Sequence, residues 1–161
     1  MAFTDDVQRL IDDPLGGRSV EEVRRLASSE LADRVLAHPP QAFMIEKFCA
    51  EHDYSVEAAH EIFEETKRFL LIGELLDESL APSLPVDLMW HAWILFTKDY
   101  HEFCALLGGY IHHRPIPSGS AEQPPIEPTV AIMEAAYGSV DDLAWPQELG
   151  SYGIMDCKKG P

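Results

Sequence analysis

The residues with the clearest chemical potential lie between Asp87 and His113. Asp87 precedes His91 by four residues, so on a helix the carboxylate and the imidazole lie one turn apart on the same side. His112 and His113 follow Gly108-Gly109, a helix stop from which the chain can turn back towards His91. Carboxylates and imidazoles are ligands for zinc, iron and manganese. The spacing therefore allows a metal site built from Asp87, His91 and either His112 or His113.

The same residues also fit a purely structural role. A histidine on a largely apolar helix face is usually a hydrogen-bonded core group. In this interpretation His91 lies within the helix packing, Asp87 pairs with Arg68 or Lys98, and Trp90 belongs to the core. Composition alone favours this structural interpretation over the metal site.

A third hypothesis is hydrolysis with Cys104 or a serine as the nucleophile. On one straight helix, Cys104 lies roughly 140° around the axis from His91 and about 20 Å along it, so the two cannot share a site. His101 is not placed to form a triad with Cys104. An acidic chain also lacks the electropositive surroundings of a reactive thiol. Because no base, nucleophile and oxyanion donor can be assembled, the residues do not identify an enzyme, and the balance is against one.

Helices are expected to position these residues. Ser19 and Glu22 form a capping box, Ser55 is a good N-cap, and apolar residues recur at helical intervals. We expect an all-α, single compact helical domain over residues 1–161, with five or six helices and a proline-rich loop near the C-terminus. The predicted helices run from residue 19 up to Pro39-Pro40 and over 42–51, 56–77, 85–107 and 129–137, with five prolines between 115 and 128.

Two contacts follow from this arrangement. The helix over 56–77 should pack against the helix over 85–107, and Arg68 should approach Asp87. Residues 1–40 are expected to form an N-terminal helical extension, and residues 147–161 a tail.

The charge of the chain limits its partners. Twelve Lys and Arg against 28 Asp and Glu give a formal net charge of −16, which disfavours nucleic-acid binding and leaves a basic protein as a possible partner.

The three cysteines show no CxxC spacing, and no apolar run approaches the length of a membrane span. Because the N-terminus also lacks the features of a signal peptide, we expect a cytoplasmic protein without membrane segments.

One family resemblance involves the same segment. The chain resembles glycine-rich domain-containing protein-like sequences of bacteria and plants over about residues 41–146. The resemblance depends mainly on Pro82-Ser83, Val86-Asp87, Trp90-His91, Ile94-Leu95, Thr97, Tyr100, Cys104, Gly109 and His112-His113-Arg114-Pro115. It implies that Asp87, Trp90, His91, Tyr100, His112 and Pro115 act as a set. Trp93 stands where many relatives carry a second histidine, and the glycine-rich tail is absent.

Two functional hypotheses remain. The first is a small soluble binding or interaction module whose acidic surface meets a basic partner. The second is a metal- or small-ligand-binding, enzyme-like site. Its candidate residues are Arg68, Asp87, Trp90, His91, Tyr100, His112 and His113, with Asp87, His91, His112 and His113 as the best ligands for a divalent metal such as zinc or iron. We favour the first hypothesis slightly from the sequence, because no general base, nucleophile and oxyanion donor can be assembled from these residues.

Overall fold

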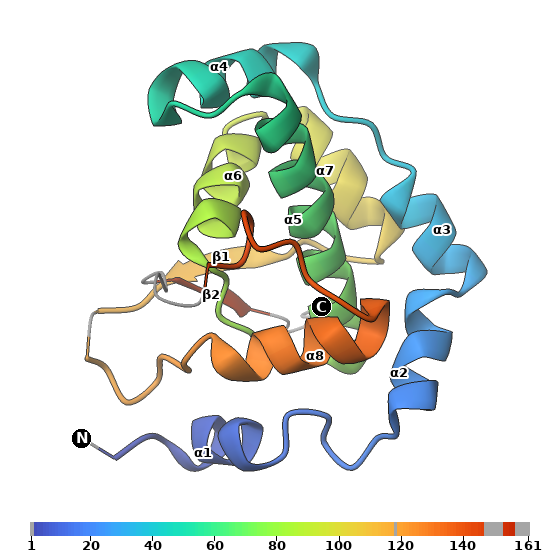
Figure 1. Ribbon diagram of the computed structural model, residues 1–161, viewed down its shortest axis with the longest axis vertical. Coiled ribbons are helices and arrows are strands. Elements are labelled where there is room, and N and C mark those ends of the chain that lie inside the picture. The colour runs from blue at the N-terminus through green and yellow to red at the C-terminus, as the bar shows by residue number, and fades with distance from the viewer. Residues whose placement is uncertain (1, 118, 147–152, 157–161) are drawn as a thin grey trace.

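The computed structural model describes residues 2–117, 119–146 and 153–156 (Figure 1). The predicted all-α class is confirmed, although the helices within these residues number eight instead of five or six. They are α1 (Asp5–Asp12), α2 (Val20–Ala27), α3 (Glu30–Leu36), α4 (Ala42–His52), α5 (Val56–Leu76), α6 (Leu84–Ile94), α7 (Thr97–Leu106) and α8 (Glu127–Tyr137). Two short strands accompany them, β1 (His112–Pro115) and β2 (Gly153–Asp156).

Two of the additional helices arise because a predicted helix is interrupted, and the third is the short helix α1. The N-terminal helix divides at Ser28-Ser29, because the Ser29 hydroxyl caps α3 by accepting a hydrogen bond from the backbone of Ala32. The helix predicted over 85–107 divides at Leu95-Phe96, where Phe96 has φ −89° and ψ 68° and leaves the helical region. Helix α1 is too short for its apolar period to be recognised.

Helix α5 is the centre of the fold (Figure 1). Its second half is buried on nearly every side, since Phe69, Leu70, Leu71 and Ile72 are all fully buried. A helix that is apolar all round must be covered by other elements. The contacts include the predicted packing of α5 against α6, and α2, α3, α4 and α8 also contact α5.

A small sheet, which periodicity did not predict, lies beside α6 (Figure 1). After α7 the chain turns at Gly108, whose φ of +87° favours glycine, and then enters β1. Strand β1 pairs antiparallel with β2, with His113 opposite Met155. Apart from these four residues, the predicted tail over 147–161 lies outside the described residues. Within the described chain, no helix is both long enough and apolar enough to cross a membrane.

Candidate metal centre

Helix α6 fixes the positions of Asp87 and His91. The hydroxyl of Ser83 caps the helix by accepting a hydrogen bond from the backbone of Val86, and Pro85 in the first turn suits a helix start. Asp87 therefore lies in the first turn and His91 one turn later. The Asp87 Oδ2 atom is 3.6 Å from His91 Nδ1.

The chain after α7 brings His113 to the same carboxylate. The Tyr100 hydroxyl accepts a hydrogen bond from Trp90 Nε1 at 2.9 Å and donates one to the carbonyl oxygen of Ile111 at 2.6 Å. This connection holds the start of β1 against α6. His113 Nε2 then donates to Asp87 Oδ1 at 2.5 Å, because an ionised carboxylate can only accept.

The two imidazoles lie against each other and against an indole. The ring centroids of His91 and His113 are 4.2 Å apart, and those of Trp90 and His113 are 4.5 Å apart. Trp90 is completely buried, so its ring limits the positions that the His113 ring can take. Trp90 and Tyr100 are thus positioning residues for His113.

Asp87, His91 and His113 form a set of ligand atoms that could hold a metal ion. One atom from each residue lies within 4.8 Å of the others. The side chains of Asp87 and His113 are 8% and 7% exposed, whereas that of His91 is 52% exposed. Two of the three ligand groups are therefore fixed in the interior, and the third faces solvent.

Burial also affects the protonation of His91. Partial burial lowers the pKa of His91, the neighbouring Asp87 carboxylate opposes this effect, and His113 adds to it. The net direction favours the neutral imidazole, which is the form with a lone pair for a metal.

Two predicted site residues, His112 and Arg68, lie outside the group formed by Asp87, His91 and His113. His112, which neighbours His113 on β1, is exposed and packs on the ring of Tyr110, with centroids 4.6 Å apart. Side chains alternate between the two faces of a strand, so only one of the two histidines can face Asp87. His112 does not join the group, and His113 provides the second imidazole.

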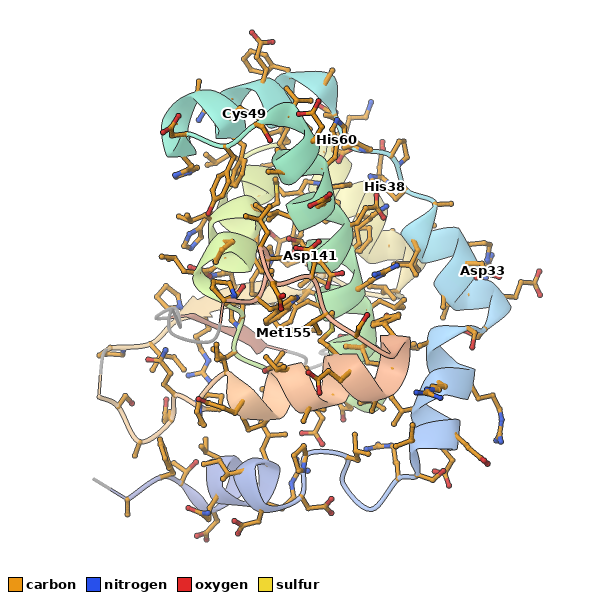
Figure 2. The ribbon with its side chains drawn as sticks, in the orientation of Figure 1. Asp33, His38, Cys49, His60, Asp141 and Met155 are labelled. Carbon is orange, nitrogen blue, oxygen red and sulfur yellow. The ribbon has the colours of Figure 1, made fainter. Side chains whose placement is uncertain are left out.

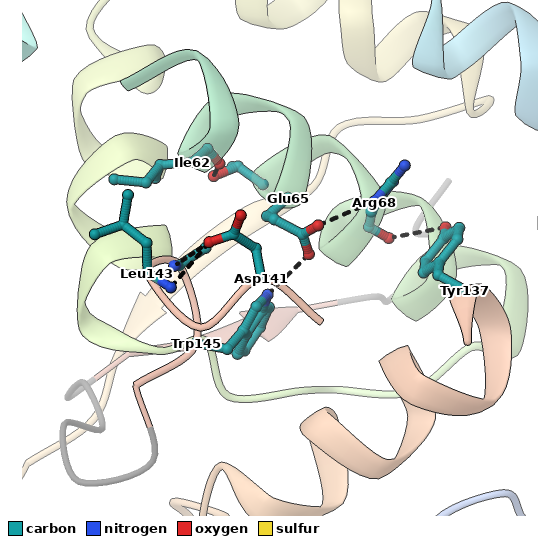
Figure 3. A network of polar contacts seen from close by, with 9 residues as sticks. Ile62, Glu65, Arg68, Tyr137, Asp141, Leu143 and Trp145 are labelled. Atoms are coloured by element: carbon teal, nitrogen blue, oxygen red, sulfur yellow. Dashed lines mark hydrogen bonds and ion pairs between the residues drawn. The ribbon is translucent and has the colours of Figure 1, made fainter. Parts of the chain in front are cut away.

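The expected approach of Arg68 to Asp87 is wrong, because Arg68 pairs within its own helix (Figure 3). Arg68 pairs with Glu65 at 3.0 Å and lies over the ring of Tyr137, 5.0 Å from its centroid. Glu65 also accepts a hydrogen bond from Trp145 Nε1 at 3.0 Å. This network ties α5 to the end of α8 and to the segment after it, so Arg68 takes part in that packing and pairs with Glu65 instead of Asp87.

Cys104 also stays outside the group, although the straight helix used to exclude it is interrupted at Leu95-Phe96. Its thiol is buried beside Tyr100, and burial raises the pKa of Cys104. A thiol with a raised pKa is a poor nucleophile at neutral pH.

Sequence reasoning missed a second polar cluster, formed by His38, Trp93 and Asp99. Asp99 Oδ1 lies 3.2 Å from His38 Nε2, and Asp99 Oδ2 accepts a hydrogen bond from Trp93 Nε1 at 2.7 Å. His38 precedes Asp99 by 61 residues, so no local spacing announces the contact. The cluster satisfies buried polar atoms and links the segment before α4 to α7.

A family model described as UCP032817-like matches residues 32–123, which is more than half of the chain and includes Asp87, His91 and His113. This description states no activity, ligand or partner. The resemblance to glycine-rich domain-containing protein-like sequences is therefore wrong, because the matched family is a different one. No curated protein matches the chain. No solved structure matches it either.

Proposed function

The chain belongs to the UCP032817-like family, and we propose that, within the matched region, Asp87, His91 and His113 bind a divalent transition metal. The main support for this proposal is that two imidazoles and one carboxylate, from α6 and β1, lie close enough to bind one ion. Two histidines and one carboxylate are a ligand set found for zinc and for non-haem iron.

A structural lock between α6 and β1 would need only Asp87 and His113. Their hydrogen bond satisfies the buried carboxylate and the buried ring nitrogen without His91. Yet Nδ1 of His91, a half-exposed side chain, lies 3.6 Å from the other oxygen of the same carboxylate. An exposed side chain gains little stability from that contact, so its placement favours a metal ligand over a packing role.

The arrangement is also suited to exchange of a proton for a metal. The His113 Nε2 hydrogen points at Asp87, so a metal that took its place would meet both ligand atoms, and the displaced proton would move to Nδ1 of the ring or to water. The exposed side of His91 gives access from solvent. With three protein ligands, a four-coordinate ion keeps one position for water or a small ligand.

Zinc titration of the chelator-treated protein tests the proposal. We expect one Zn²⁺ per chain, and Co²⁺ in its place should give the visible absorption of a protein-bound ion. His113→Ala and Asp87→Asn should each weaken zinc binding by more than about 100-fold, since losing even an outer partner of a ligand costs about 10–100-fold.

His112→Ala is the matched control, because it removes the neighbouring imidazole of the same strand and leaves the ligand set complete. It should bind zinc as the natural chain does. The proposal would be overturned if the natural chain bound no stoichiometric metal, or if His113→Ala bound zinc as tightly as His112→Ala.

The interaction module with a basic partner stays a prediction. Its support is the formal charge of −16. A pull-down at low salt, where charge attraction is strongest, is the direct check, and capture of no basic protein would count against it.

A further inference from the structure

Met155 contacts the segment that leads into α6 and the strand that carries His113. Its backbone N–H donates to the carbonyl oxygen of Leu80 at 2.9 Å, in the segment that leads into α6. It also lies opposite His113 in the pairing of β2 with β1. Met155 therefore bridges the segment before Asp87 and His91 to the strand of His113.

The Met155 side chain is seated deep in the fold (Figure 2). It is completely buried, and its thioether lies against Gly73 on α5. A Cβ atom on residue 73 would overlap the Met155 sulfur, so the absence of a side chain there makes room for Met155. Glycine otherwise weakens the middle of a helix, and here it creates a pocket for the C-terminal strand.

The segment between Leu80 and Ser83 connects Met155 to the start of α6. Leu80 and Ala81 are fully buried, and the Ser83 hydroxyl, which caps α6, donates to the carbonyl oxygen of Ala144. This buried segment ends four residues before Asp87. On the other side, a strand as short as β1 depends on its partner strand to keep His113 in position.

We propose that docking of β2 through Met155 controls the metal affinity of Asp87, His91 and His113, an inference that rests on the proposed function. Docking orders β1 and the start of α6 in the geometry that the metal requires. Binding of the metal in turn fixes β1 and strengthens docking. Such a coupling is reciprocal, so each event strengthens the other by the same factor.

The affinity for Zn²⁺, measured by competition with a chromophoric chelator, tests the first direction. Met155→Ala should weaken zinc binding by about 5- to 150-fold, the usual range of coupling between two sites. Gly73→Leu should have a similar effect, because leucine fills the Met155 pocket while it favours the helix more than glycine does. Because both substitutions remove the same contact between Met155 and residue 73, the double variant should bind zinc no more weakly than either single variant.

Met44→Ala is the matched control. Met44 is also a fully buried methionine, but it lies on α4, which is separated from β1 and β2 in the fold (Figure 1). It should lower stability without changing zinc affinity. Equal zinc affinities for Met155→Ala, Gly73→Leu and Met44→Ala would overturn the inference and leave the proposed metal site intact.

Hydrogen exchange of the natural chain tests the second direction and needs no variant. The Met155 amide should exchange more slowly with saturating Zn²⁺ than without it. The factor by which exchange slows should equal the factor by which Met155→Ala weakens zinc binding. Unchanged exchange in a zinc-loaded chain would overturn the coupling alone. A natural chain that binds no zinc would overturn the proposed function itself, so the two failures are distinguishable.

Discussion

Asp87 on α6 and His113 on β1 are joined by a hydrogen bond of 2.5 Å, although they lie 26 residues apart in the sequence. Both side chains are more than nine-tenths buried. The contact connects the first turn of a helix to a strand of only four residues. It therefore fixes the local fold and, at the same time, the distance between two candidate ligands.

Breaking this pair should destabilise the metal-free protein. His113→Ala leaves the Asp87 carboxylate buried with one acceptor unpaired, which costs about 1–3 kcal/mol. His112→Ala removes an exposed ring and should cost less than about 0.5 kcal/mol. Urea unfolding in the presence of a chelator measures both values. Equal losses in the two variants would show that the Asp87–His113 pair does not stabilise the fold.

Zinc should raise the thermal stability of the natural chain. A ligand that binds only the folded state stabilises it by about 2.7 kcal/mol when its free concentration is 100 times Kd. Asp87→Asn keeps the size of the side chain but removes the charge shared by His91 and His113. Thermal unfolding of this variant should therefore be insensitive to zinc, and a normal zinc-dependent rise in Tm would contradict the ligand role of Asp87.

The pH dependence of stability should carry a contribution from Glu65. Burial raises the pKa of Glu65 above its ordinary value of 4.5, and the pairing with Arg68 and Trp145 only partly opposes this effect. Between pH 4.5 and the higher pKa of the folded state, the folded chain holds more protons at Glu65 than the unfolded chain does. The stability supplied by this carboxyl is therefore complete below pH 4.5 and declines as the pH rises through that window.

Glu65→Gln isolates this contribution, because glutamine does not titrate. The free energy of unfolding of the natural chain minus that of Glu65→Gln should fall as the pH increases from 4.5 towards neutrality. Urea titrations of both chains at a series of pH values give the difference. A difference that is constant, or that grows with pH, would contradict the raised pKa.

Lys67 should be an important residue for folding stability. Its ammonium group is buried and donates to the carbonyl oxygens of Leu36 at 2.6 Å and His38 at 2.8 Å, where α3 ends. Lys67→Met would leave these acceptors without their partner and should cost about 1–3 kcal/mol. Lys47→Met, which breaks the exposed pair with Glu51 on α4, should have a much smaller effect in the same urea experiment.

The sequence by itself determined the features that depend on neighbours within a few residues. Ser19 and Ser55 cap α2 and α5 as predicted, because a hydroxyl reaches an amide three residues ahead in any helix start. The same local rule placed Asp87 next to His91, one helical turn later. The all-α class followed from the helical spacing of apolar residues along the chain.

Only the tertiary structure decided which distant side chains meet. It selected His113 instead of His112, because strand alternation turns one of them to α6 and the other to Tyr110. It paired Arg68 with Glu65 instead of Asp87, and it interrupted the long helix at Leu95. It also brought Met155 opposite His113. These contacts depend on how helices pack and where the chain turns, and such long-range geometry leaves no periodic signal in one sequence.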